Sequence, residues 1–141
     1  MGRKSLVTRK RLLAIVDDEK DITALFRDVL QRIKGISIIT FNDPKIALEH
    51  FKNNSAAYAV VISDFRMPEI DGMELIKKMK DSNPFVRTIL MTAFELDDNL
   101  FKQYTEKQVI NIFLQKPIGL DELLAEVNNQ LHAYELQKKS G

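Results

Sequence analysis

Five polar residues in this sequence come at or just after the ends of short apolar runs. They are, in chain order, Asp17, Asp18, Asp64, Thr92 and Lys116. Crowded carboxylates repel one another, and a cation that prefers oxygen ligands, such as Mg²⁺, relieves that repulsion. A carboxylate can also act as a nucleophile toward a phosphoryl group, while a metal ion and a lysine neutralise the transferred charge. These residue types therefore suit magnesium-dependent phosphoryl transfer to an aspartate, provided that the fold brings them together.

In this chemistry Asp64 would be the nucleophile, Asp17 and Asp18 would hold the metal, and a lysine would contact the phosphate. Each residue also has an ordinary structural explanation. Either of the two adjacent aspartates can cap a following helix, and Asp64 can be a turn residue. Taken singly, Thr92 can be a plain strand end and Lys116 a surface lysine. Their shared position favours a common site, because unrelated polar residues would be scattered over both ends of the sheet.

Short apolar runs alternate along the chain with stretches in which apolar residues recur at i, i+3, i+4 and i+7. The runs predict strands and the stretches predict helices. The predicted strands are 11–16, 36–41, 58–63, 86–91 and 109–114. The predicted helices are 21–33, one opened by Asp43 and Pro44, 72–81, 95–107 and one that begins after Gly119. Gly35 is expected to cap the first helix at its C-terminus.

Near-continuous apolar strands joined by helices predict an α/β fold with a parallel sheet covered on both faces. Right-handed crossovers make such a sheet doubly wound, here with five strands and five helices. Ligands of open parallel sheets bind at the carboxyl ends of the strands. The polar residues would therefore share one rim. The second strand ends in Phe41 and Asn42, which bring no charge to it.

The composition restricts the classes of protein to consider. A chain of 141 residues with 45% hydrophobic and 29% charged residues suits one globular domain with a substantial core. The net charge of +1 gives no bias toward nucleic acid or an anionic membrane. The absence of cysteine excludes disulfides, thiolate catalysis and cysteine-ligated zinc. No secretory segment or membrane-length span is present, so we expect a cytoplasmic protein with no membrane partner and no direct nucleic acid partner.

We expect the domain to occupy residues 10–136, between a basic N-terminal tail (1–9) and a C-terminal tail (137–141). Arg3 and Lys4 contribute to the basic character of the first segment. A solvated tail explains that charge more simply than a binding patch does. The chain is expected to be either a stand-alone domain or one excised from a longer protein with an effector domain.

The sequence resembles the receiver domains of two-component response regulators, and among them the chemotaxis regulators. The resemblance covers about residues 10–135 and includes motifs in the family's order. These motifs are IVDDE (15–19), ISDFRMPEIDG (62–72), MTAF (91–94) and FLQKP (113–117). The combination is highly specific, although no single motif would be. It implies a flavodoxin-like fold with the strand order 2-1-3-4-5.

The resemblance also implies roles for individual residues. Asp64 matches the phosphoacceptor, and Asp17 and Asp18 match the acidic pair that holds Mg²⁺. Arg66, two positions beyond the phosphoacceptor, would give its backbone carbonyl to the same metal. Lys116 matches the lysine that contacts the phosphoryl group.

Two further positions match the family's switch residues. Thr92 matches the hydroxyl that moves toward the phosphoryl group. Phe113 occupies the place of the aromatic switch residue, although by pattern alone such a residue is more often plain core. The resemblance further implies that the peptide bond before Pro117 is cis.

The implied function is a phosphorylation-controlled signalling switch that catalyses only its own phosphorylation and dephosphorylation. A histidine kinase or histidine phosphotransfer protein would be the donor. A downstream protein or a second copy would bind the face formed by the fourth helix, fifth strand and fifth helix. This role would make the chain a phosphoprotein of phosphorelay signal transduction.

Three other classes of protein fit the sequence less well. An aspartate-nucleophile phosphatase typically has an acid two residues after the nucleophile, where this chain has Arg66. A constitutive interaction module without phosphorylation has no need of the complete site. A nucleotide-binding Rossmann domain requires a glycine-rich first turn, and IVDDEKD contains no glycine.

Some positions depart from the family's usual pattern. Gly119 stands where an aspartate or serine cap is more common, and Gln108 stands where a glycine commonly precedes the fifth strand. Arg66 is a bulky cation beside the site, and Phe94 follows Thr92-Ala93. None of these removes a group that the chemistry needs. They affect the expected rate of dephosphorylation and the expected shape of the partner-binding face formed by the fourth helix, fifth strand and fifth helix.

Overall fold

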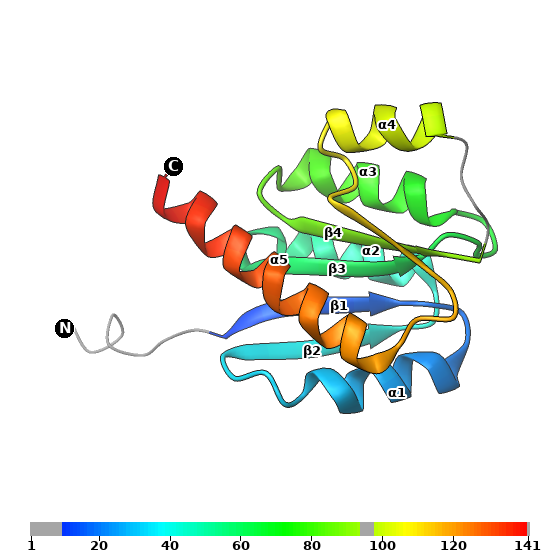
Figure 1. Ribbon diagram of the computed structural model, residues 1–141, viewed down its shortest axis with the longest axis horizontal. Helices are drawn as coiled ribbons and strands as arrows, with labels where there is room; N and C mark the ends of the chain where they lie inside the picture. Colours follow the sequence, from blue (N-terminus) through cyan, green and yellow to red (C-terminus); the bar gives the residue numbers. More distant parts are fainter. Residues whose placement is uncertain (1–9, 94–97, 141) are drawn as a thin grey trace.

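The computed structural model describes residues 10–93 and 98–140. Strands and helices alternate along this part of the chain (Figure 1). The strands are β1 (Arg11–Val16), β2 (Ile36–Phe41), β3 (Tyr58–Asp64), β4 (Arg87–Thr92) and β5 (Ile112–Gln115). The helices are α1 (Lys20–Leu30), α2 (Pro44–Asn53), α3 (Gly72–Ser82), α4 (Asp98–Glu106) and α5 (Leu120–Ser140), with a short 3-10 helix η2 (Ser55–Ala57) before β3.

The strands form one parallel sheet in the order β2-β1-β3-β4-β5. This confirms the predicted doubly wound sheet and its strand order. The order reverses between β1 and β3, so the connections that leave these two strands run to opposite faces of the sheet. The rim at the carboxyl ends of β1 and β3 is therefore the place where a ligand site is expected.

Helices α1 and α5 cover one face of the sheet, and α2 and α3 cover the other (Figure 1). Strand β1 shows the division, because successive side chains of a strand point to opposite faces. Leu13 and Ile15 belong to the core beneath α1 and α5. Ala14 and Val16 belong to the core beneath α2 and α3. Since both faces are buried, the apolar run is continuous rather than alternating.

Two helices begin at aspartates that cap them. The Asp43 side chain accepts a hydrogen bond from the backbone N–H of Lys45 at 2.9 Å, and Pro44 opens α2 as predicted. Asp71 accepts in the same way from the backbone N–H of Glu74 and starts α3. The capping of α3 sets where the loop after β3 ends.

The predicted cap of the first helix is wrong. Helix α1 ends at Leu30, and the N–H of Gln31 still donates to the carbonyl of Arg27, after which the chain leaves through a turn. Ile33 packs against the core from this turn, so the apolar pattern continues beyond the helix itself. Gly35 has a φ of 84° in the turn, a left-handed conformation that favours glycine.

The fifth strand is shorter than predicted and begins at Ile112. The N–H groups of Val109 and Ile110 both donate to the carbonyl of Tyr104, so these residues close the end of α4 instead of joining the sheet. Of the predicted helix 95–107, the structure describes α4 from Asp98. Phe94 and residues 95–97 of the predicted helix lie outside the described residues, as does the N-terminal tail.

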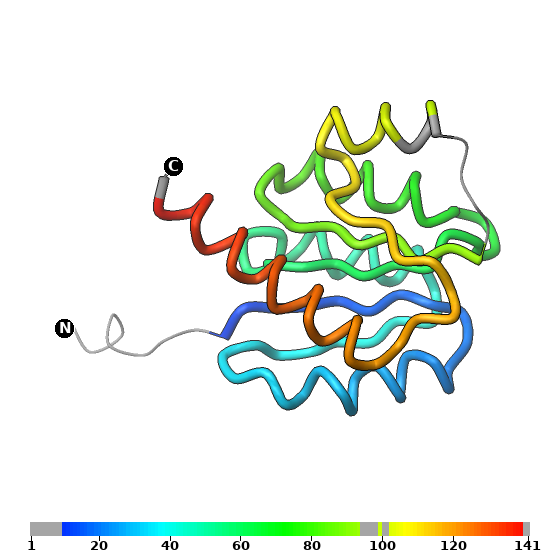
Figure 2. Tube along the Cα trace, viewed as in Figure 1, coloured from blue at the N-terminus to red at the C-terminus, as the bar shows by residue number. Residues whose placement is uncertain are grey.

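Helix α5 continues to Ser140, whereas the sequence predicts a tail from residue 137. The Gln137 side chain accepts a hydrogen bond from Arg87 of β4 at 3.1 Å, which attaches this turn to the sheet. The start of β1 (blue) and the end of α5 (red) lie at the same edge of the molecule (Figure 2), and the carboxyl ends of the strands lie at the opposite edge.

Across residues 10–93 and 98–140, the structure contains no helix with the length and apolar character needed to cross a membrane.

Candidate functional site

The register of the sheet brings the predicted polar residues together. Val16 of β1 pairs with Ser63 of β3, so the residues that follow them, Asp17 and Asp64, are neighbours on the rim. On the other side of β3, Asp64 pairs with the residue directly before Thr92. Side chains from different parts of the chain thus form one row because parallel strands end at one edge.

The three predicted metal-holding carboxylates lie close together. One oxygen each of Asp17, Asp18 and Asp64 lies within 4.8 Å of the others. Asp17 is fully buried and Asp64 is 7% exposed, whereas Asp18 is exposed. The cluster therefore has a buried side against the sheet and an open side at the surface.

Asp17 carries a buried oxygen that lacks a hydrogen bond. Its Oδ1 accepts a bond from the backbone N–H of Glu19 at 2.9 Å, but Oδ2 has no hydrogen-bond partner among the described residues. Burial raises the pKa of Asp17 to about 6. The bond from Glu19 opposes this rise, the charge of Asp64 adds to it, and the charge of Lys116 opposes it. The charged form of Asp17 is thus the costly one until a further cation compensates it.

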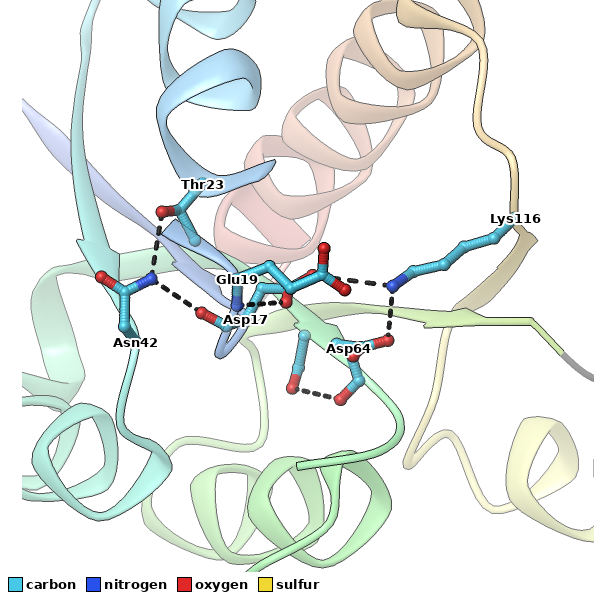
Figure 3. Close-up of polar contacts among 7 residues, drawn as sticks. Asp17, Glu19, Thr23, Asn42, Asp64 and Lys116 are labelled. Carbon is cyan, nitrogen blue, oxygen red and sulfur yellow. Dashed lines mark hydrogen bonds and ion pairs between the residues drawn. The ribbon is translucent and has the colours of Figure 1, made fainter. Parts of the chain in front are cut away.

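Lys116 provides the positive charge of the site (Figure 3). Its Nζ lies 3.0 Å from Asp64 Oδ1 and 3.7 Å from Asp17 Oδ2. Burial disfavours the charged lysine, but the hydrogen bond and charge of Asp64 and the charge of Asp17 raise the pKa of Lys116 above 10.5. The backbone N–H of Lys116 donates to the carbonyl of Thr92 at 2.8 Å, and the peptide bond to Pro117 is cis, as the resemblance implies.

A small cavity opens beside Asp64. Its volume is about 100 Å³, and its walls include Phe65, Arg66, Thr92 and Lys116. Thr92 is 4% exposed, so its hydroxyl belongs to the site rather than to the outer surface. The Arg66 side chain is exposed. The cavity is where a group bonded to Asp64 would meet a hydroxyl and an ammonium.

Phe113 stands apart from this cavity. It is partly buried and packs against the core cluster that contains Ile76 of α3 and Leu90 of β4. Leu90 is its partner in the β4–β5 register and comes two residues before Thr92. The structure thus places Phe113 near Thr92 and in the core, which leaves the predicted switch roles of both residues predictions.

Gly72 has a role that the sequence analysis missed. Its N–H donates to the carbonyl of Phe65 at 2.7 Å, which brings the start of α3 against the end of β3. A Cβ at this position would lie 2.2 Å from the carbonyl oxygen of Asp64 and 2.6 Å from Leu90 Cδ1. Only glycine permits so close an approach. The Asp71-Gly72 pair was visible in the sequence as a turn signal, but the contact with Asp64 was not.

Asn42 was also missed, because the end of β2 brings no charge. Its Nδ2 donates to the carbonyl of Asp17 at 2.8 Å and lies 3.1 Å from Thr23 Oγ1 (Figure 3). The pairing of the first two strands could have indicated it. Phe41 pairs with Val16, so the residues that follow them, Asn42 and Asp17, are adjacent.

The donor set suits a small, hard cation. Three carboxylates, one of them with an unsatisfied buried oxygen, form an all-oxygen cluster of the kind that Mg²⁺ prefers. A carboxylate next to a lysine and a hydroxyl is also suited to accept a phosphoryl group and to have its charge neutralised.

Comparison with known proteins agrees with this geometry. The response regulator receiver domain family matches residues 13–128. The DNA-binding transcriptional regulator NtrC of Klebsiella pneumoniae is 33% identical over 128 residues, which cover 89% of this chain and 26% of NtrC. Response regulator SaeR of Staphylococcus epidermidis is 32% identical over 119 residues, which cover 84% of this chain and 49% of SaeR. The chain spans about a quarter of the first relative and about half of the second.

A solved structure supports the fold. The response regulator receiver domain protein from Clostridium thermocellum superposes with a TM-score of 0.78 at 24% sequence identity. The superposition covers 90% of this chain and 98% of that chain. The arrangement of β1 to β5 and their helices is therefore the fold of that structure.

Proposed function

Because this chain belongs to the response regulator receiver domain family, we propose that it is a signalling switch that accepts a phosphoryl group on Asp64 in a Mg²⁺-dependent reaction. The observation that carries the proposal is the 3.0 Å contact between Lys116 Nζ and Asp64 Oδ1, in a row that also contains Asp17 and Thr92. The chain acts on no separate substrate. It catalyses only its own phosphorylation and dephosphorylation.

The phosphoryl group comes from a phosphohistidine of a histidine kinase or phosphotransfer protein. A carboxylate oxygen of Asp64 forms a bond to phosphorus while the bond from phosphorus to the imidazole nitrogen breaks. The imidazole leaves with the electron pair of the broken bond and takes a proton. Lys116 neutralises negative charge on the phosphoryl oxygens, and Thr92 can donate one hydrogen bond to them. Attack of water on phosphorus later releases phosphate and restores Asp64.

The residues fit a magnesium ion at the acidic cluster. Asp17, Asp18 and Asp64 would hold it, together with the backbone carbonyl of Arg66. The unsatisfied Oδ2 of Asp17 supports this assignment, because a cation would compensate its burial. When bound, Mg²⁺ supplies positive charge next to the phosphoryl oxygens. The affinity is expected to be modest, because Mg²⁺ keeps several of its waters in sites of this kind.

A groove beside the cavity suits the donor. It has a volume of about 500 Å³ and runs from α1 to residues 116–118. Its lining includes Leu25, which is 45% exposed, together with Ile22 and Ile118. Lys116 and Ala93 border both the groove and the cavity. A donor helix seated in this apolar groove would hold its histidine next to Asp64.

The output surface is proposed to be the face formed by α4, β5 and α5. Phosphorylation adds about −1.5 to −2 charges at Asp64, which draws Thr92 and Lys116 inward. Movement of Thr92 opens space near Phe113, whose turning inward would change this face. A downstream protein or a second copy of the chain would then bind there.

The proposal is tested by phosphorylation with a small phosphodonor in the presence of Mg²⁺. Intact-mass measurement should show one phosphoryl addition to the wild type and none to Asp64→Asn. Asp71→Asn is the matched control, because Asp71 is an exposed aspartate of the same loop. It should be labelled like the wild type. Equal labelling of Asp64→Asn, or loss of labelling on removal of Asp71 alone, would refute Asp64 as the acceptor.

A further inference from the structure

Asn42 lies directly after β2, on the side of Asp17 away from Asp64. Its amide reaches two groups of other elements (Figure 3). Nδ2 donates to the carbonyl of Asp17 at 2.8 Å and lies 3.1 Å from Thr23 Oγ1 in α1. One amide group thus joins the ends of two strands and the first turn of a helix.

The direction of the second bond follows from the Thr23 hydroxyl. That hydroxyl donates its one proton to the carbonyl of Lys20 at 3.0 Å, so it accepts from Asn42. Thr23 is 3% exposed, which excludes solvent as a substitute partner. Both protons of the Asn42 amide are therefore in use, and a side chain without donors cannot replace it.

These bonds leave one oxygen of Asp17 for a ligand. The N–H of Asp17 donates to the carbonyl of Phe41 at 3.0 Å, its carbonyl accepts from Asn42, and its Oδ1 accepts from Glu19. Oδ2 has no hydrogen bond to the described residues and lies 3.7 Å from Lys116 Nζ. The backbone of Asp17 is thus held on the β2 side, and Oδ2 lies on the side of Lys116.

Asn42 is the main side-chain support of the loop that carries Asp17. Glu19 stands at the N-cap of α1, yet its side chain makes no capping hydrogen bond within the described part of the chain. The N–H of Glu19 is satisfied by Asp17 itself. Beside the backbone bonds of the loop, the Asn42 amide therefore joins both ends of the connection from β1 to α1.

We propose that Asn42 is a positioning residue for the divalent cation site, and that it acts by holding Asp17 so that Oδ2 points at the cation. The inference rests on the proposed function in that the cation is taken to be Mg²⁺. Partners that orient metal ligands in this way typically contribute about 10- to 100-fold to metal affinity. Loss of the Asn42 amide should therefore weaken Mg²⁺ binding by about tenfold or more.

Two substitutions separate the hydrogen bonds from the bulk of the side chain. Asn42→Leu keeps about the same size but has no donors and adds no charge, and Asn42→Ala removes the whole amide. Asn54→Leu is the matched control, because Asn54 Nδ2 also donates to a backbone carbonyl, that of His50, but after α2 and away from the site. Mg²⁺ affinity is measured by calorimetry and by amide shifts in NMR. Both Asn42 variants should bind Mg²⁺ about tenfold or more weakly, and Asn54→Leu should bind it as the wild type does.

A second pair of variants keeps the test decisive if substitution of Asn42 prevents folding. Thr23→Val removes the acceptor of the second bond with little change of shape, and Thr23→Ser retains it. Thr23→Val should weaken Mg²⁺ binding, and Thr23→Ser should restore most of the affinity. Unchanged Mg²⁺ affinity in Thr23→Val, or in the folded Asn42 variants, would overturn the inference.

The phosphorylation rate, measured at several Mg²⁺ concentrations, distinguishes a weakened cation site from a general loss of structure. In Asn42→Ala the rate at low Mg²⁺ should fall, and at saturating Mg²⁺ it should return close to the wild-type rate, because Asp64 and Lys116 are intact. A rate that stays low at saturation would overturn the inference. Failure of the wild type itself to accept phosphate would refute the proposed function, while the Mg²⁺ affinities would still test Asn42.

Discussion

Lys116 reaches Asp64 across the end of an intervening strand. Lys116 follows β5 and Asp64 is the last residue of β3. These strands are separated in the sheet by β4, yet Nζ and Oδ1 are 3.0 Å apart. The length of the lysine side chain makes this possible, and its charge offsets the repulsion between Asp64 and Asp17. The same ammonium would also compete with the proposed metal ion for the carboxylates.

Lys116→Met should therefore separate phosphorylation from metal binding. Methionine retains much of the apolar stem but removes the charge. We expect the phosphorylation rate to fall about 100-fold, as when one preorganised donor is lost from a transition state. Mg²⁺ affinity should stay equal or rise, because a competing cation is gone. Mass measurement over time and calorimetry test this, with Lys77→Met on the exposed side of α3 as the control. A parallel loss of both properties would contradict the prediction.

Asp17 should make stability depend on pH when no divalent cation is present. Its pKa is about 6 in the folded chain and 3.8 in the unfolded chain, so folding strengthens proton binding. The resulting stabilisation is complete below pH 3.8 and is lost as the pH rises to about 6. The difference is worth about 3 kcal/mol. The free energy of unfolding of the wild type, relative to Asp17→Asn, should fall by about this amount between about pH 4 and pH 7.

Denaturant unfolding in a chelator measures this difference. Adding Mg²⁺ at neutral pH should remove most of it in the wild type and affect Asp17→Asn much less, because that variant lacks the buried charge of Asp17. An identical pH dependence in the two proteins would show that Asp17 does not carry this cost.

Gly72→Ala should destabilise the chain strongly. The new Cβ would meet the carbonyl oxygen of Asp64 at 2.2 Å and the carbonyl carbon at 3.0 Å, and backbone atoms cannot move aside cheaply. We expect a loss of about 3 kcal/mol in the free energy of unfolding. Gly119→Ala is the control, because its Cβ would meet nothing closer than 3.9 Å. Similar stability of the two variants in denaturant unfolding would count against the close approach.

Gln108→Gly should stabilise the chain. Gln108 has a φ of 58°, a left-handed conformation that costs a residue with a side chain about 1 kcal/mol or more. Glycine adopts it freely, so the free energy of unfolding should rise by about 1 kcal/mol. Lys107 lies one residue earlier and has no positive φ. Lys107→Gly should therefore lower the free energy of unfolding. Thermal unfolding compares the two, and a lower midpoint for Gln108→Gly would refute the account.

Thr92→Ala should accept a phosphoryl group at Asp64 but fail to transmit the change. Thr92 is buried between the cavity and the core, so it can couple the two. Beryllofluoride, a mimic of the phosphoryl group, should shift amide signals in α4, β5 and α5 of the wild type and much less in Thr92→Ala. Thr40→Ala on β2 should behave like the wild type. Equal shifts in wild type and Thr92→Ala would exclude coupling through this hydroxyl.

The sequence by itself determined the order of elements and the residues at the strand ends. Apolar periodicity is a local property, so it identified five strands and placed Asp17, Asp64 and Thr92 at their ends. The motifs around these residues then indicated the family and the strand order. The residues at which strands and helices end were harder to predict, because they depend on competing hydrogen bonds. Val109 continues an apolar run, yet its N–H closes α4 through Tyr104.

The tertiary structure alone decided how the site residues are held. Gly72 is required because α3 starts against the carbonyl of Asp64, and Asn42 matters because its amide meets Asp17 and Thr23. The unsatisfied oxygen of Asp17 and its raised pKa likewise depend on which groups surround it. These contacts join residues distant in the chain, and their strength is set by distance and burial. A sequence pattern records which groups are available, whereas only the packed strands and helices bring donor, acceptor and charge within reach of one another.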